Sequence, residues 1–334
     1  MGTEKNSLNL LTDISGVSVG HATDLALGSG VTAVIFDRPV TASGSVLGGA
    51  PGGRDTALLD PSMTVETVDA FVLSGGSAFG LDAAGGVQAG LRDIGRGFAV
   101  GSVTVPIVPQ AILMDLLNGG NKDWGLHSPY RDMGHAAFVA AKPGRFQLGT
   151  VGAGTGATTA TFKGGIGSAS GRTHAGHTVA ALVAVNALGS ATIGNGPHFW
   201  AAPFESNGEF GGLGMPSTFD TTLRLKGARV TATTIGIVVT DALLTKAQAH
   251  RMSILAHEGL SRAVLPAHLP FDGDTMFAAA TGAKDVADMQ ELMEILHLAS
   301  IVTARAIARG VYEATALPFE GAQSSWRDRF GLPA

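Results

Sequence analysis

Glycine interrupts this sequence at short intervals, and its placement restricts the folds that the chain can adopt. The 334 residues include 48 glycines, which lie between short apolar runs and follow no collagen-like period. Glycine in such positions is typical of tight turns and close backbone contacts, because it has no Cβ atom. With 45% hydrophobic and 15% charged residues, the chain can also build a sizeable core. We therefore expect a compact α/β protein, and residues 1–334 are interpreted as a single domain.

Short apolar runs predict strands, and they cover residues 16–19, 31–36, 70–73, 98–105, 178–186 and 234–240. Helical spacing predicts helices over residues 78–92 and 286–311, and a third that opens at Thr245 and stops before Pro266. Gln248 follows Thr245 by three residues, as in a capping box. Strands and helices do not alternate regularly. Two packed sheets covered by helices on both outer sides are therefore favoured over a Rossmann sheet.

Cysteine is absent, and this restricts the chemistry open to the chain. Disulfides, thiolate nucleophiles and thiolate metal sites are excluded, so a covalent nucleophile must be Ser, Thr, Lys or a carboxylate. The net charge of −5 and the lack of a basic stripe argue against a nucleic-acid partner. Residues 1–13 do not resemble a secretory signal, and no stretch of about 20 apolar residues predicts a membrane span. We expect a cytoplasmic protein.

The segment 230–241 is rich in Thr, Val and Ile, and taken alone it is typical of an ordinary strand. Its hydroxyls also permit a second chemistry. A hydroxyl beside a strained peptide bond can attack the preceding carbonyl, and hydrolysis of the resulting ester frees a new α-amino group on the same residue. With a pKa of roughly 7.7–8.0, that amine can accept the hydroxyl proton at neutral pH. The residues alone leave both readings open.

Five motifs occur in a fixed order along the chain. They are DISGVSVGHATD at 13–24, GGAPGGRD at 48–55, LSGGSAFGLDAA at 73–84, TTIGIVVTD at 233–241 and PFDGDTMF at 270–277. With these motifs, the sequence resembles the L-aminopeptidase/D-amino-acid esterase family over nearly its whole length. That family includes the β-peptidyl aminopeptidases and the endo-type nylon-oligomer hydrolases.

The resemblance implies an αββα four-layer sandwich of two packed sheets flanked by helices. It also implies self-cleavage between Ala232 and Thr233, into a large subunit 1–232 and a small subunit 233–334. Thr233 would then be an N-terminal nucleophile that forms an acyl-enzyme on small peptides or amides. Neither a metal nor an organic cofactor is expected, and the cleaved pairs would assemble into homo-oligomers.

Four further site residues follow from the resemblance. Asp272 and Asp274 match the acidic or hydroxyl pair beside the family's nucleophile, where Asp274 would hold the α-ammonium or orient the hydroxyl. Lys163 matches a lysine of the nylon-oligomer hydrolases, where a buried cation would lower the hydroxyl pKa or stabilise charge. Asn186 matches an asparagine proposed for the oxyanion hole. The alternatives are a polar turn for the aspartates, a surface lysine, and a strand-end turn residue.

Two positions depart from the family's pattern. Ala232 stands where relatives often have Asn, although some have Gly, so the efficiency of self-cleavage stays open. Met114 stands where some members have an active-site tyrosine, and a methionine offers no useful donor.

Three other functions remain open. The first is an endo-acting amidase or esterase on ω-amino-acid oligomers, which would use the same residues. The second is an uncleaved, non-catalytic member of the fold. The third is acyl transfer between amino acids, of the ornithine acetyltransferase type.

Three weaker signals have structural interpretations. His174 and His177 form an HxxH pair without a convincingly spaced third ligand, so structural or substrate-pocket roles are favoured over zinc. The glycine-rich segment 152–156 lacks the full dinucleotide fingerprint and predicts a turn beside the active site. The SGGS turn at 74–77 precedes a predicted helix, and we expect it to line the cleft or to pack backbones closely.

Overall fold

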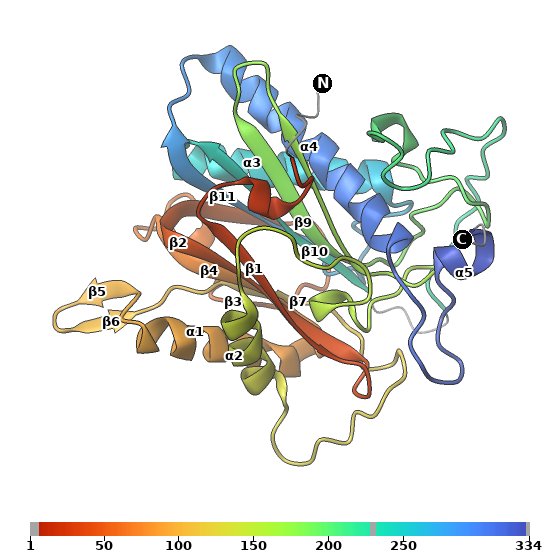
Figure 1. Cartoon of the computed structure of the whole chain (residues 1–334), viewed down its shortest axis with the longest axis horizontal. Coiled ribbons are helices and arrows are strands. Elements are labelled where there is room, and N and C mark those ends of the chain that lie inside the picture. The colour runs from red at the N-terminus through yellow and green to blue at the C-terminus, as the bar shows by residue number, and fades with distance from the viewer. Residues whose placement is uncertain (1–6, 228–231, 332–334) are drawn as a thin grey trace.

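The computed structural model describes residues 7–227 and 232–331, and these form four layers (Figure 1). Helices α1 (Ala83–Asp93) and α2 (Tyr130–Ala140) cover one outer face, and α3 (Lys246–Ala263) and α4 (Met289–Tyr312) cover the other. The strands lie between these two helical layers. The expected αββα sandwich is confirmed. The predicted segment 230–241 begins at residues that lie outside the described part, which starts again at Ala232.

One hydrogen-bonded path runs through the strands in the order β3-β7-β4-β2-β11-β10-β9-β8, with β1 against β2. The path joins both sheet layers through β2, which has 18 residues: residues 31–35 and 40–41 pair with β4, and residues 41–46 pair with β11. The strands are β1 (Val17–Asp24), β2 (Ser29–Val46), β3 (Gly53–Arg54), β4 (Thr67–Ser74), β7 (Gln110–Ile112), β8 (Ile166–Arg172), β9 (Thr178–Asn186), β10 (Thr233–Ala242) and β11 (Thr275–Lys284).

Within the described residues, three buried apolar clusters separate the four layers. Strand β9 shows the arrangement, since successive side chains of a strand point to opposite faces. Its odd-numbered residues from 179 to 185 pack with α3 and α4, while its even-numbered residues from 180 to 184 pack with β1, β2 and β4. Phe71 of β4 stacks on Phe277 of β11 across the middle cluster, with ring centroids 4.6 Å apart. The third cluster lies under α1 and α2.

Most predicted elements are confirmed, with shifted ends. Strands β2, β4, β9 and β10 contain the predicted ranges, and β1 overlaps its own. Thr245 caps α3 together with Gln248, as predicted. Helix α4 begins three residues later than predicted, because the Asp288 side chain accepts the N–H groups of Gln290 and Glu291 as an N-cap. The predicted helix 78–92 is divided into a 3-10 helix, Ser77–Asp82, followed by α1.

The predicted single strand 98–105 is wrong. The chain turns back at Gly101, whose φ of 59° suits glycine, and forms a hairpin of β5 (Phe98–Val100) and β6 (Val103–Val105). Strands β8 and β11, helix α2 and the short helix α5 (Trp326–Phe330) were not predicted. Among the described residues, no helix combines the length and the apolar character needed to cross a membrane.

Glycine allows α4 to lie close against β8. A Cβ atom on Gly167 would stand 1.8 Å from the carbonyl oxygen of Ala306 in α4, so any side chain there would separate the two elements. On the same strand, a Cβ atom on Gly171 would first meet the flexible end of Leu298, at 2.9 Å.

We predict that Gly167→Ala lowers the free energy of unfolding by about 1–3 kcal/mol, because overpacking must be relieved by backbone movement. Denaturant unfolding followed by circular dichroism measures this change. Gly171→Ala is the matched control and should cost clearly less, since the Leu298 side chain can move. Equal losses for the two variants would contradict the close approach of α4 to Gly167.

Candidate active site

Thr233 is the first residue of β10, a strand that pairs with β9 on one side and β11 on the other. The side chain is buried, with 4% of the residue exposed. Its hydroxyl lies 2.5 Å from the carbonyl oxygen of Ala232, toward which it donates. In the intact chain, the hydroxyl therefore lies directly against the peptide group that precedes it.

The Ala232 carbonyl has a second donor from the backbone. The N–H of Gly273 donates to this oxygen at 3.0 Å, and Ala232 forms a parallel bridge with Asp272. A Cβ atom on Gly273 would stand 2.7 Å from the Thr233 hydroxyl oxygen, so the glycine of the DGD motif leaves room for the hydroxyl. A backbone N–H aimed at a carbonyl oxygen can stabilise the negative charge that develops when that carbonyl is attacked.

Asp274 holds the start of β10 in place. It is 1% exposed, and its Oδ1 atom accepts the N–H of Thr234 at 2.8 Å. Its Oδ2 atom accepts the N–H of His268 at 3.0 Å and lies 3.0 Å from the Nδ1 atom of the same residue. The carboxylate thus connects the residue after Thr233 to an imidazole on the preceding loop.

Asp272 is equally buried and binds the backbone of two other segments. Its two oxygens accept the N–H groups of Leu188 and Leu269, at 3.3 and 3.2 Å. Burial, and after it the negative charge of Asp274, raises the pKa of Asp272. The turn lies just before the DGD motif, at residues 270–271, and Asp272 and Asp274 bond alongside Ala232 and Thr234, on either side of Thr233.

Asn186 lies directly opposite Thr233 in the antiparallel pairing of β9 and β10. Its Oδ1 atom accepts the Thr158 N–H at 3.0 Å and the Lys226 ammonium at 2.5 Å. These two donors fix the orientation of the amide, and its Nδ2 atom donates to the carbonyl of Met114 at 3.1 Å. In the intact chain, Met114 therefore contributes to the site through its backbone oxygen.

Lys163 is a buried lysine, with 1% of the residue exposed. Its ammonium donates to the carbonyls of Gly154 and Gly164, at 2.9 and 2.8 Å. Gly154 belongs to the glycine-rich segment that was predicted as a turn beside the site. Burial, together with the positive charge of Lys226, lowers the pKa of Lys163 to about 7. A bridge to Thr158 connects this lysine to Asn186.

Lys226 was not identified from the sequence. Besides the bond to Asn186, its backbone N–H donates to the carbonyl of Leu188 at 2.9 Å. Burial lowers its pKa to about 7, against the attraction of Asp115 and Asp272. This lysine lies outside the five motifs. It is 40 residues from Asn186 in the chain, so no sequence spacing connects the two residues.

A third carboxylate lies behind the SGGS turn. Asp115 is fully buried; it accepts the N–H of Gly76 at 2.8 Å and the Ser29 hydroxyl at 2.6 Å. Tyr130 in turn donates to Ser29 at 2.9 Å. Burial raises the pKa of Asp115. The turn therefore binds an internal anion and packs closely, since a Cβ atom on Gly75 would stand 2.1 Å from the Asp115 carboxylate.

The two histidines of the HxxH pair lie away from Thr233. His177 precedes β9, whereas Asn186 ends it, and a strand rises roughly 3.3 Å per residue. The buried His177 pairs with Glu291 of α4 at 3.2 Å, and the exposed His174 lies 3.6 Å from Glu294. These contacts support structural roles for both.

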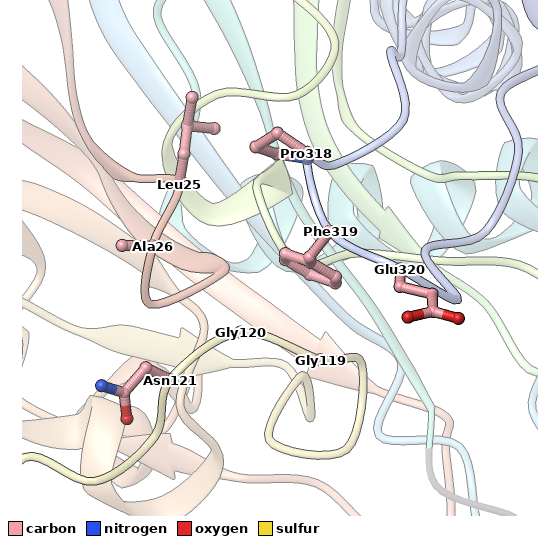
Figure 2. A pocket seen from close by; sticks show the side chains of 8 residues that line it. All are labelled: Leu25, Ala26, Gly119, Gly120, Asn121, Pro318, Phe319 and Glu320. Atoms are coloured by element: carbon pink, nitrogen blue, oxygen red, sulfur yellow. The ribbon is translucent and has the colours of Figure 1, made fainter.

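A pocket of about 690 Å³ opens between three loops (Figure 2). It lies between the turn after β1, residues 119–121 and residues 318–320. Asn118, beside this pocket, donates to the carbonyl of Gly156 at 2.6 Å and to the Thr158 hydroxyl at 3.3 Å. The pocket is therefore connected to Asn186 through Thr158.

The four-layer sandwich is a fold that known structures share. Two solved structures share this fold. A β-aminopeptidase from Burkholderia sp. has a TM-score of 0.73 and 22% identity, over 98% of this chain and 96% of its own. An L-aminopeptidase D-Ala-esterase/amidase from Ochrobactrum anthropi, described as a variant of the Ntn hydrolase fold, has a TM-score of 0.72 and 19% identity, over 98% and 95%.

Sequence comparison identifies the family. The chain matches the model of Peptidase family S58 over residues 9–324, and it belongs to this family. It is 41% identical over 290 residues to an uncharacterized aminopeptidase of Mycobacterium tuberculosis, covering 83% of this chain and 82% of the relative. It is 25% identical over 288 residues to a 6-aminohexanoate-oligomer endohydrolase of Agromyces sp., covering 82% and 75%. The expected family resemblance is confirmed.

We predict that the buried ammonium of Lys163 makes stability depend on pH. An unfolded lysine has a pKa of about 10.4, so above about pH 7 the unfolded chain binds more protons than the folded one. The free energy of unfolding of the natural chain should therefore rise with pH relative to Lys163→Met, by up to about 1.4 kcal/mol per pH unit. Denaturant titrations from about pH 7 to about pH 9 measure this difference.

The exposed Lys142 provides the matched control. Lys142→Met should differ from the natural chain by an amount that does not change with pH. A pH-independent difference for Lys163→Met as well would mean that Lys163 keeps an ordinary pKa.

Proposed function

We propose that this chain is a self-processing N-terminal-nucleophile amide hydrolase, in which Thr233 cleaves the Ala232–Thr233 bond and then attacks substrates. The observation that carries the proposal is the position of the Thr233 hydroxyl, 2.5 Å from the oxygen of the carbonyl that it would attack. Membership of a peptidase family supports the class of reaction.

The self-cleavage step uses groups that lie around this bond. The Thr233 hydroxyl oxygen attacks the Ala232 carbonyl carbon, and the Gly273 N–H stabilises the oxyanion. The C–N bond then breaks, and the hydroxyl proton passes to the departing nitrogen. The product is an ester between Ala232 and Thr233. Water hydrolyses the ester and releases a carboxylate on Ala232 together with a free α-amino group and hydroxyl on Thr233.

The same threonine then acts on substrates. Its α-amino group takes the hydroxyl proton as the oxygen attacks the amide carbonyl, the leaving amine receives that proton, and an acyl-enzyme remains. Water completes the cycle and releases the acid. Asp274 holds the start of β10, while the amide of Asn186 and the protonated form of Lys163, whose pKa is about 7, stabilise negative charge that develops in the site.

The substrates that we propose are small peptides or amides with a free amino end. The names of the relatives support this class, since two of the similar proteins are aminopeptidases. The pocket beside Asn118 is of the size that a small molecule occupies. A second candidate is endo-type hydrolysis of ω-amino-acid oligomers, which the buried Lys163 and the similarity to an oligomer endohydrolase favour.

Assembly into homo-oligomers of cleaved pairs, in the cytoplasm, is part of the proposal. The β5–β6 hairpin supports the assembly. Its paired residues Phe98 with Val105 and Val100 with Val103 lie on one face and are all exposed. An exposed apolar face of this kind is typical of an interaction surface. The hairpin extends away from the body of the molecule (Figure 1).

We predict that the natural chain runs as two fragments on a denaturing gel and that Thr233→Ala runs as one, since alanine has no nucleophile. Intact masses and N-terminal sequencing should place the cut before Thr233. Thr234→Val is the matched control. It removes the next hydroxyl of the strand, which has no hydrogen-bond partner among the described residues, and it should leave self-cleavage in place. A natural chain that stays whole through long incubation would contradict the proposal.

We further predict that the cleaved protein hydrolyses p-nitroanilides of amino acids with a free amino group, and that Thr233→Ala does not. A panel of α-, β-, D- and ω-amino-acid anilides, with 6-aminohexanoate oligomers beside them, distinguishes the two candidate functions by the ratio of their kcat/KM values. Faster turnover of the internal bonds of the oligomers would favour the endo-type enzyme. Hydrolysis of neither group by a fully cleaved protein would exclude both.

A further inference from the structure

We propose that His268 is a positioning residue for the Thr233 chemistry: its imidazolium pairs with the Asp274 carboxylate and keeps that carboxylate oriented on the N–H of Thr234. The inference rests on the proposed self-cleavage and deepens it. His268 itself touches neither the Ala232–Thr233 peptide bond nor a substrate.

The backbone N–H of His268 donates to one oxygen of Asp274, and the ring makes an ion-pair contact with the same oxygen. The backbone N–H donates to Oδ2 at 3.0 Å, and the Nδ1 atom of the ring lies 3.0 Å from the same oxygen. The other oxygen, Oδ1, is left to accept the N–H of Thr234 at 2.8 Å. The carboxylate therefore has one oxygen on the loop and one on the strand that begins with Thr233.

The backbone of His268 adopts a conformation that this contact requires. Its φ of 59° lies in the left-handed region, which is uncommon for residues other than glycine, although Asn, Asp and His adopt it more readily than most. Such a conformation persists where surrounding contacts hold it. Here the backbone N–H donates to Asp274, and the ring lies against the same carboxylate.

The surroundings of the ring favour a cation. His257 of α3 contacts it edge to face, with ring centroids 4.9 Å apart, and burial lowers the pKa of His257 to about 4, so this neighbour is neutral. The other titratable groups that face His268 are the carboxylates of Asp274 and Asp272. Burial disfavours the imidazolium, but the bond to Asp274 and the charges of both carboxylates outweigh it and raise the pKa of His268.

The His268 imidazolium offsets negative charge in the pair formed by Asp272 and Asp274. Asp272 and Asp274 are separated by one glycine and are each 1% exposed, and two buried carboxylates so close together favour protonation of one of them. The imidazolium pairs with one oxygen of Asp274, and the other oxygen accepts the Thr234 N–H in a charge-assisted hydrogen bond. As the pH rises through the pKa of His268, this support is lost, and the start of β10 is held less firmly.

His268→Asn tests the role. Asparagine tolerates the left-handed backbone, and its amide can still donate to Asp274, but it carries no charge. Self-cleavage is followed by synthesising the full chain in a cell-free system and separating precursor from fragments over time at several pH values. The ratio of the natural rate to the variant rate cancels every other pH effect.

We expect this ratio to be roughly three- to tenfold at about pH 6 and to approach one at about pH 9, since the natural histidine then also lacks its charge. His250→Asn, on the same helix as His257, is the matched control, because the His250 ring bonds to the carbonyl of Gly44. Its ratio should not vary with pH. A ratio for His268→Asn that is constant over the whole range would overturn the inference and leave His268 with a structural role only.

A second measurement leaves His268 unchanged. In full-length Thr233→Ala protein, NMR titration of the histidine rings should give a His268 pKa above the ordinary value of about 6.5, and Asp274→Asn in the same background should lower it. A His268 pKa at or below the ordinary value would overturn the inference even if His268→Asn failed to fold. A natural chain that never cleaves would instead refute the proposed function.

Discussion

The pairing of β10 with its two neighbours is the constraint on which the site depends. Its antiparallel register with β9 sets Thr233 opposite Asn186, and its parallel register with β11 sets Ile235 beside Thr275, so that the DGD motif lies alongside residues 232–234. Side chains alternate between the two faces of a strand, so a slip of one residue would turn the Thr233 hydroxyl to the opposite face. Groups from three distant parts of the sequence thus meet because of one strand register.

Buried charge is the second constraint, because buried carboxylates and cations lie in the same region. Asp115, Asp272 and Asp274 are buried carboxylates, and the cations that act on them include Lys122, Lys163, Lys226 and His268. A buried charge without a partner is costly, so removal of one member affects the others. Under the proposed mechanism, self-cleavage adds an α-amino group at Thr233, opposite Asn186, whose amide binds Lys226 and connects through Thr158 to Lys163. The positive charge of the two lysines lowers the pKa of that amine, which favours the neutral base that the reaction needs.

Sequence patterns predicted the parts of the fold where one local signal dominates. Strands β9 and β10 are continuous apolar runs, and α3 begins with a capping box, so both kinds of element were found. Strand β8 was missed because its sequence, IGSASGR, consists mainly of small and polar residues, and it is buried only because α4 lies so close. The range 98–105 alternates as a strand does, and nothing in its apolar pattern showed that Gly101 reverses the chain.

Site residues were predictable only where a motif marked them. Thr233, Asp272 and Asp274 lie within motifs, and Lys163 and Asn186 were identified by resemblance to relatives. Lys226 and His268 have no such mark, because their roles arise from contacts between segments that no spacing in the sequence connects. The orientation of the Asn186 amide was equally hidden, since three groups from separate loops determine it.

The hydrogen-bond donors around Ala232 bear on whether an alanine can stand at this position, where relatives often have asparagine. An asparagine before the cleaved bond could supply a side-chain amide, and alanine supplies none. Here the carbonyl oxygen of Ala232 already accepts from the backbone N–H of Gly273 at 3.0 Å and from the Thr233 hydroxyl at 2.5 Å. Both contacts come from the backbone path of β10 and the DGD motif, and neither depends on the side chain of residue 232. Under the proposed mechanism, oxyanion stabilisation at this bond therefore depends on the backbone of Gly273 and not on the side chain of residue 232, and any side chain at position 273 would collide with the Thr233 hydroxyl.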